Sequence, residues 1–291
     1  MRMSKLVKRE HLFGISPCLA SISAGRRKIY KIWLNEKISE EGSKRAALTQ
    51  IIEKADNMGI AVKYKPRTVL DRISRNKPHQ NVVMETGRLN FKPFDKDQLL
   101  VSSRLDKKDF LFALDQIHDP MNFGAIIRSA YYFGVDKIIV GNRNSCGLTP
   151  TVSKASAGAM EWAQVYGVDS MEKFLKRKLD NRYSEMLNNV AACCSFHFQQ
   201  SVKLNWDVIG TSKPSGSHRD VVYTCDSLKI NKPCILVLGN EGFGLSSSIA
   251  DICTKMVTIP PGNDTLPHDV DSLNVSVAAG ILLHSLLKCW R

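Results

Sequence analysis

From residue 109 onward the chain alternates short apolar runs with longer amphipathic segments. Runs typical of strands cover residues 110–114, 137–140, 164–168, 206–210, 234–238 and 256–259. Apolar residues recur at helical spacing over residues 123–133, 152–160, 171–187 and 275–287. Continuous apolar strands that alternate with helices are typical of a parallel sheet covered on both faces. The sequence therefore predicts an α/β fold for this part of the chain.

A smaller α/β pattern lies between residues 11 and 86. Its clearest helix is Ser43–Met58, an amphipathic segment that Gly59 ends. Another helix is expected to begin near Pro17, with strands at 29–34, 60–64 and 82–84. Residues 87–108 show little periodicity and are interpreted as a linker. We therefore expect domains at 11–86 and 109–291, preceded at 1–10 by a basic arm or short presequence.

The positive charge of the chain is concentrated in its first third. Residues 1–108 hold 24 Lys and Arg against 11 Asp and Glu, and residues 109–291 hold 17 against 17. The whole excess of +13 therefore lies in the first third, where a polyanion such as RNA would gain affinity from counterion release. Basic residues predicted to bind RNA are Arg26, Arg27, Lys28, Lys63, Lys65 and Arg67. A solubility device or a targeting signal are the alternative interpretations.

Composition also excludes several classes of protein. No apolar run approaches the roughly 20 residues that a membrane span requires. The eight cysteines are scattered without a C-x-x-C pair, so we expect reduced thiols and no metal site. We expect no membrane partner.

Three segments place unusual polar residues where apolar runs end. In the first, Asp119-Pro120 follows a strand, Asn122 is a candidate helix cap, and Gly124 permits close packing. We expect Arg128 and Asn122 to face the same helix end. A buried salt bridge is the alternative interpretation of Arg128, which lies among apolar residues.

The second segment, Leu238 to Leu245, follows the strand 234–238 directly. A dinucleotide-binding loop needs G-x-G-x-x-G, and Glu241 occupies the second glycine position, so a nucleotide-dependent oxidoreductase is excluded. The segment instead predicts a tight turn that presents Asn240 and Glu241 to a small ligand.

The third segment runs from Met256 to Leu287. It predicts a strand, a polar loop over Asn263–Asp271, and a helix with Ser272 as N-cap and Lys288 at its negative end. Ligands of α/β sheets usually lie at such loops, beyond the carboxyl ends of the strands.

Together these segments resemble the three ordered motifs of the SPOUT superfamily, in its TrmH/SpoU branch of RNA ribose 2′-O-methyltransferases. The residues that carry the resemblance are Asp119-Pro-x-Asn122-x-Gly124-x-x-x-Arg128-Ser129-Ala130, Gly239-Asn240-Glu241-Gly242, Ile259-Pro260 and Ser272-Leu273-Asn274-Val275-Ser276. Upstream, Leu12–Leu19 and His79–Glu85 are similar to the substrate-binding domain of mitochondrial members of this family.

The resemblance implies a trefoil-knotted methyltransferase domain with a parallel sheet and a small N-terminal L30e-like RNA-binding domain. It implies S-adenosylmethionine as cofactor, a guanosine ribose of large-subunit ribosomal RNA as substrate, a homodimer, and the mitochondrial matrix as location. Implied catalytic residues are Arg128, Asn122, Glu241, Ser272 and Asn274. Implied cofactor-binding residues are Leu238, Gly239, Asn240, Gly242, Ile259, Leu273 and Asn274.

The resemblance assigns Arg128 the role of base, but a guanidinium is effectively always protonated. Holding an RNA phosphate and stabilising the developing alkoxide is a physically easier role for this residue. A non-catalytic rRNA-binding assembly factor is the alternative function, and the complete set of motif residues argues against it.

Overall fold

The computed structural model describes residues 8–37, 43–94, 109–180, 206–212, 222–262 and 272–288. The chain divides into two compact units. The first unit consists of residues 1–91, 119–131 and 146–163, and the second consists of 92–118, 132–145 and 164–291. Two segments of the predicted C-terminal domain therefore group with the N-terminal residues.

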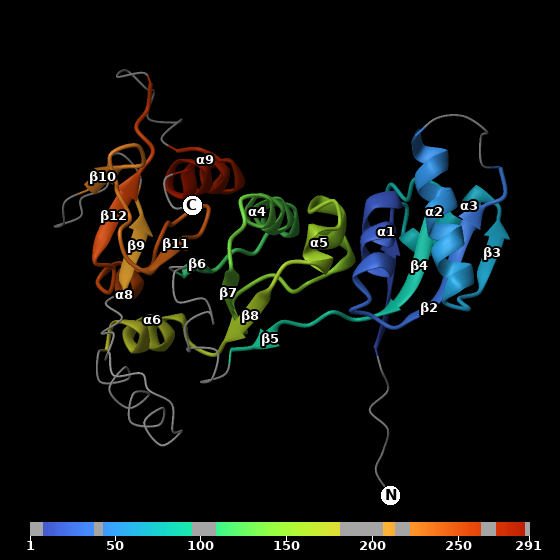
Figure 1. Cartoon of the computed structure of the whole chain (residues 1–291), viewed down its shortest axis with the longest axis horizontal. Helices are drawn as coiled ribbons and strands as arrows, with labels where there is room; N and C mark the ends of the chain where they lie inside the picture. Colours follow the sequence, from blue (N-terminus) through green and yellow to red (C-terminus); the bar gives the residue numbers. More distant parts are fainter. Residues whose placement is uncertain are drawn as a thin grey trace, which may run out of the picture. The chain divides into compact units, whose positions relative to one another are not determined.

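The first unit is built on a four-stranded sheet, here called the small sheet. Its elements in chain order are β1 (Arg9–Phe13), α1 (Ile15–Ala24), β2 (Ile29–Asn35), α2 (Ser43–Asn57), β3 (Val62–Lys65), α3 (Arg67–Ser74) and β4 (Val82–Gly87). The strand order is β1-β4-β2-β3, with β2 and β3 parallel and the other pairs antiparallel (Figure 1). Strand residues Leu12, Ile32 and Met84 pack with α1 and α2 in one buried cluster, so these helices cover one face.

The first unit also contains α4 (Pro120–Tyr132), α5 (Pro150–Ala155) and a short 3-10 turn, η2 (Ala159–Glu161). A Cβ built on Gly124 of α4 would lie 2.5 Å from the Ala155 Cβ and 2.7 Å from the Val152 carbonyl oxygen. Contacts this short are not tolerated between carbon and backbone atoms, so only glycine permits the observed approach of α4 to α5. The predicted packing role of Gly124 is confirmed.

A buried ion pair joins the start of the small sheet to η2. The Arg27 guanidinium donates to both carboxylate oxygens of Glu161, from Nε at 2.7 Å and from Nη2 at 2.9 Å. It also donates to Glu10 and to the Gly87 carbonyl, and both Arg27 and Glu161 have fully buried side chains. Such a pair is stable in low dielectric because charge-assisted hydrogen bonds compensate both ions for their lost hydration.

The second unit is built on an eight-stranded sheet, here called the large sheet. Its strands are β5 (Lys92–Pro93), β6 (Phe110–Leu114), β7 (Lys137–Gly141), β8 (Val165–Val168), β9 (Asp207–Thr211), β10 (Val222–Thr224), β11 (Cys234–Leu238) and β12 (Lys255–Thr258). All pairs are parallel, in the order β10-β12-β9-β11-β6-β7-β8-β5. The predicted parallel sheet is confirmed, and the carboxyl ends of its strands lie at one edge.

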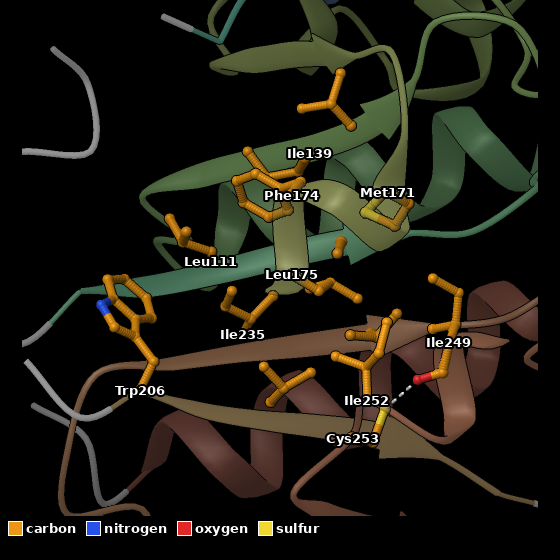
Figure 2. Packing of buried hydrophobic residues seen from close by; sticks show 14 of the residues in the cluster. Leu111, Ile139, Met171, Phe174, Leu175, Trp206, Ile235, Ile249, Ile252 and Cys253 are labelled. Atoms are coloured by element: carbon orange, nitrogen blue, oxygen red, sulfur yellow. Dashed lines mark hydrogen bonds between the residues drawn. The ribbon is translucent and has the colours of Figure 1, made fainter. Parts of the chain in front are cut away.

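Helices cover both faces of the large sheet. On one face α6 (Met171–Leu179) and α8 (Ser247–Ala250) enclose a cluster whose labelled side chains interdigitate in Figure 2. Phe174 and Leu175 of α6 reach Ile235 of β11 in this cluster. Figure 1 shows α9 (Val275–Lys288) on the side of the sheet away from α6. Among the described residues no helix is long and apolar enough to span a membrane.

Several elements differ from the sequence prediction. The predicted helix 152–160 is broken, because Ala157 and Gly158 take left-handed backbone angles between α5 and η2. The predicted linker contributes β5, which pairs with β8. Strands β1 and β10 and helices α3 and α8 were not predicted, because short elements carry too few apolar positions to show a period. The predicted helix 171–187 ends as α6 at Leu179, and its remainder lies largely outside the described residues.

The buried pair generates a stability prediction. Glu161→Gln keeps the shape of the side chain but leaves the buried Arg27 without its main counter-charge. We expect the free energy of unfolding, measured by chemical denaturation, to fall by about 3 kcal/mol. Glu172→Gln is the control, because Glu172 pairs with Lys176 on the exposed surface of α6, and it should change little. An equal, small effect of both substitutions would contradict the role given to Arg27 and Glu161.

Candidate active site

The turn after β11 is fixed by a very close approach of backbone to backbone. A Cβ built on Gly239 would lie 2.3 Å from the Gly244 carbonyl carbon and 2.5 Å from the Leu245 nitrogen. Asn240 and Gly244 exchange two backbone hydrogen bonds, of 2.9 and 3.0 Å, and Gly244 takes a positive φ of 71°. The predicted tight turn is confirmed, and Gly239 is the residue whose lack of a side chain permits it.

The Asn240 side chain holds this turn against the end of β6. Its Nδ2 donates to the Gln116 carbonyl at 2.8 Å, and its Oδ1 accepts from the Gly242 N–H at 2.9 Å. Gln116 itself takes a left-handed backbone angle, with φ at 59°. Asn240 therefore positions the loop through its side chain.

Asp115 is a residue of this site that sequence analysis did not select. It lies directly after the wholly buried β6, and its N–H donates to the Leu238 carbonyl at 2.8 Å. Burial raises the pKa of the Asp115 carboxyl, and hydrogen bonds from Ser246 oppose the rise. The signal in the sequence is an acidic residue directly after an apolar strand. It is weaker than the nearby Asp119-Pro120 pattern.

Beyond the clamped residues the turn is open to solvent. Glu241 and Gly242 are exposed, and Phe243 is 96% exposed. The turn thus presents a carboxylate and an aromatic ring beyond the carboxyl edge of the large sheet.

Ile259 follows β12 at the same edge. Because β9 lies between β12 and β11, the two strand ends are about 10 Å apart, which is two strand spacings. Ile259 is partly exposed. The predicted loop 263–271, which connects β12 to α9, lies outside the described residues.

The N-terminus of α9 carries the third group of predicted residues. Asn274, not Ser272, is the N-cap: its carbonyl accepts from the Ala278 N–H, and its Oδ1 accepts from the Ser276 N–H at 2.9 Å. The prediction for Ser272 as cap is wrong because the helix begins at Val275, two residues too late for that role. Ser272, Leu273 and Asn274 are all exposed.

Asn122 and Arg128 lie on α4, in the first unit. Here the cap is Asp119, whose carboxylate accepts from the Asn122 N–H at 2.9 Å, so the prediction that Asn122 caps the helix is wrong. Asn122 lies in the first turn and Arg128 six residues later, about 9 Å along the helix axis. Arg128 is exposed, so its alternative interpretation as a buried charge is excluded.

The six basic residues predicted to bind RNA divide into two groups. Lys28, Lys63, Lys65 and Arg67 are exposed. Arg26 donates to backbone carbonyls of Glu161 at 3.0 Å and Ala163 at 2.9 Å, and Arg27 has no exposed side-chain surface. Because its side chain is buried, Arg27 is a structural residue and is not proposed to bind RNA.

Comparisons with known proteins agree with this geometry. The family model for the SpoU rRNA Methylase family matches residues 109–284, and the model for RNA 2′-O ribose methyltransferase substrate binding matches residues 11–92. No group of three or more His, Cys, Asp or Glu that could hold a metal ion occurs within the described part of the chain.

Two relatives and one solved structure show the extent of the similarity. The human protein "rRNA methyltransferase 1, mitochondrial" is 39% identical over 277 residues, which is 95% of this chain and 72% of the relative. The "23S rRNA (guanosine-2'-O-)-methyltransferase RlmB" of Shewanella oneidensis is 30% identical, over 97% of this chain and 98% of the relative. The SpoU methyltransferase AviRb from Streptomyces viridochromogenes, solved with AdoMet, superposes with a TM-score of 0.65 at 18% identity, over 96% of this chain and 90% of that one.

A family model that covers more than half of the chain, and relatives of 30% identity or more along nearly all of it, identify the protein: this chain belongs to the SpoU rRNA methylase family.

Proposed function

We propose that this protein uses S-adenosylmethionine to methylate the 2′-hydroxyl of a guanosine in large-subunit ribosomal RNA of mitochondria. The observation that carries the proposal is the clamped turn at the joined ends of β6 and β11, which presents Glu241 beyond a buried parallel sheet. The name of the Shewanella relative supports the guanosine 2′-hydroxyl as target, and the name of the human relative supports mitochondria. The matrix is the proposed compartment, because ribosomal RNA is the proposed substrate.

The residues at the carboxyl edge suit an amphipathic cofactor. Ile259 and Leu273 offer partly exposed or exposed apolar side chains, which suit an adenine ring. The N-terminus of the 14-residue helix α9 carries a partial positive charge, which suits a carboxylate. We propose that backbone groups at Leu238, Gly239, Asn240 and Gly242 complete this binding site.

S-adenosylmethionine would supply an electrophilic methyl group on a sulfonium sulfur. The protein must stabilise the negative charge that develops on the attacking 2′-oxygen as its proton leaves. We assign Arg128 to hold the RNA phosphate and stabilise the developing negative charge, since its permanent positive charge prevents it from accepting a proton. A phosphate oxygen or a water molecule would accept the proton of the 2′-hydroxyl. Asn122, Ser272 and Asn274 are proposed to position the ribose, and Glu241 to orient the loop or the substrate.

The proposed RNA-binding surface uses the exposed basic residues Lys28, Lys63, Lys65 and Arg67 of the first unit. The excess charge of +13 in residues 1–108 supports this assignment, because each phosphate neutralised by Lys or Arg releases counterions. The boundaries 11–86 and 109–291, the trefoil knot and the homodimer remain parts of the same proposal.

The reaction is tested by incubating the full chain with methyl-labelled S-adenosylmethionine and mitochondrial ribosomal RNA. Methylation of a ribose 2′-hydroxyl blocks alkaline cleavage, so label should appear in one alkali-resistant dinucleotide that begins with guanosine. Label in alkali-sensitive nucleotides would mean base methylation. Tight RNA binding without transfer would favour a non-catalytic assembly factor.

Arg128→Ala should lower kcat for methyl transfer by about 10²- to 10³-fold, the usual effect of removing one charge-stabilising donor. The dissociation constant for S-adenosylmethionine, measured by calorimetry, should stay within about twofold of wild type. Arg177→Ala is the control, since Arg177 is an exposed arginine on α6. Undiminished transfer by Arg128→Ala would remove this residue from the mechanism.

Gly239→Ala should weaken S-adenosylmethionine binding at least about tenfold, because the new Cβ meets backbone atoms that cannot move without opening the turn. Gly262→Ala is the matched control, because a Cβ there meets nothing within 4 Å. Titration calorimetry on both variants, with thermal melts to verify folding, measures the difference. Equal cofactor affinity in a folded Gly239→Ala variant would place the cofactor elsewhere.

Replacing Lys63, Lys65 and Arg67 together by Gln should weaken RNA binding and flatten its salt dependence. Each lost phosphate contact reduces the slope of log K against log salt by about 1. Neutralising Lys173, Lys176 and Arg177, three exposed basic residues of α6, is the control of equal charge change. If both triple variants change the slope equally, binding follows net charge and not this surface.

A further inference from the structure

The face of the small sheet opposite α1 and α2 is only partly covered. Along each strand the residues that pack with α1 and α2 alternate with residues of the other face. On that other face, Phe13 and Val83 form a small cluster with Leu70 of α3, and Trp33 and Ile73 pack against it. Helix α3, only eight residues long, therefore covers the end of the face near Phe13.

The rest of this face retains solvent exposure and carries aromatic rings. His11 and Trp33 lie in contact, with ring centroids 5.6 Å apart and planes tilted by 53°. Since β4 lies between their strands, the two rings meet above β4. Both residues are partly exposed. Burial lowers the pKa of His11, nearby Glu85 opposes this decrease, and Arg75 adds to it.

A second aromatic position lies further toward the start of β2. The Arg9 guanidinium stands 4.2 Å from the centroid of the Tyr30 ring, and the Lys28 ammonium stands 5.4 Å from it. Tyr30 lies at the irregular point of the β2–β4 pairing, between Ile29 and Lys31. It is about 10 Å from Trp33 along the strand, three residues at the usual rise.

Cations surround these rings. Lys31 stands 5.5 Å from the Trp33 centroid, and exposed Lys63 is the register partner of Trp33 on β3. Exposed Arg75 lies close enough to His11 to affect its titration. The acid on this part of the face, Glu85, pairs with Arg9 at 3.0 Å. The positive charge is therefore largely uncompensated.

Partly exposed rings bordered by cations on an open sheet face suit one kind of ligand. Unpaired bases stack on aromatic side chains, and the phosphates that join them are attracted to Lys and Arg. Paired bases are stacked within their own duplex and cannot reach the rings. An acidic protein would use the cations but would leave the stacking surface without a partner.

We propose that this face binds single-stranded RNA, with an unstacked base on the His11–Trp33 pair and its phosphates on Lys31 and Lys63. This proposal rests on the proposed RNA substrate. It adds that the first unit recognises unpaired bases. Tyr30 provides a second stacking position for a neighbouring base.

The test measures binding of the full chain to a 12-nucleotide single-stranded RNA of mixed sequence and to the same strand annealed to its complement. Trp33→Leu keeps an apolar side chain against Leu70 and Ile73 but removes the ring, and Trp33→Phe keeps a ring. Tyr64→Leu is the matched control, because Tyr64 is 54% exposed on β3 but points to the opposite face from its neighbours Lys63 and Lys65. Circular dichroism and thermal melts verify the folding of each variant.

We expect Trp33→Leu to weaken single-strand binding about fivefold or more, the usual effect of losing one base–aromatic stack. Its salt slope should be unchanged, whereas Lys31→Gln should reduce the slope by about 1. The single-strand affinity of Trp33→Phe should lie within about threefold of wild type, and that of Tyr64→Leu should not change. The affinity for duplex RNA should not change in any of the Trp33 and Tyr64 variants. If Trp33→Leu does not fold, His11→Leu takes its place with the same expectation.

Unchanged single-strand affinity in folded Trp33→Leu and His11→Leu would overturn the proposal and assign the face to a protein or to a second copy of the chain. Equal losses on duplex RNA, or in Tyr64→Leu, would overturn it as well. Methyl transfer to ribosomal RNA is measured separately on the same preparations. If the wild-type protein does not transfer methyl groups, the proposed function is contradicted. The single-strand affinities of the Trp33 and His11 variants still test the stacking proposal in that case.

Discussion

The parallel register of β6 and β11 is the constraint on which the candidate site depends. Five consecutive residue pairs, ending at Leu114 and Leu238, bring the two strands to the same edge of a fully buried layer. One further hydrogen bond, from the Asp115 N–H to the Leu238 carbonyl, extends the pairing, and the Asn240 amide then closes the gap to Gln116. Two segments more than a hundred residues apart in the chain are thereby held together by strand pairing and by one side-chain hydrogen bond. Gly239 permits this arrangement, because a Cβ there would meet the backbone of Gly244 and Leu245.

A different kind of interaction organises the first unit. Arg27 donates two charge-assisted hydrogen bonds to the buried Glu161, and Arg26 donates to the carbonyls of Glu161 and Ala163 at the end of the same segment. Two of the arginines that make the first third of the chain basic are thus used for structure. Among the other basic residues, Lys31, Lys63 and Arg75 lie near the rings of Trp33 or His11 on the small sheet. Charge and stacking surface are therefore combined in one unit, and the turn that suits a cofactor lies in the other.

The sequence predicted the buried strands β6, β7, β8, β9, β11 and β12 and the helices α2 and α9, because such elements leave a periodic pattern of apolar residues. It also predicted the tight turn after β11, whereas the predicted loop 263–271 lies outside the described residues. It misplaced both caps by two or three residues: Asp119 takes the position expected for Asn122, and Asn274 the position expected for Ser272. All four residues are Asp, Asn or Ser, which are good helix caps, so only the observed start of each helix distinguishes between them. Counting charges likewise could not show that Arg27 is buried and Lys28 exposed, because adjacent residues of the same charge look alike in the sequence. The half-open sheet face was not predicted, because it is formed by residues from separate strands whose register the sequence does not show.

The most direct measurement of the central claim is a map of ribose methylation in mitochondrial large-subunit ribosomal RNA from cells depleted of this protein. The account predicts that one guanosine loses its 2′-O-methyl group while all other ribose methylations persist. Re-expression of wild type should restore that methyl group, and re-expression of an equally abundant Arg128→Ala variant should not. An unchanged methylation map in depleted cells, or full restoration by the Arg128→Ala variant, would contradict the account.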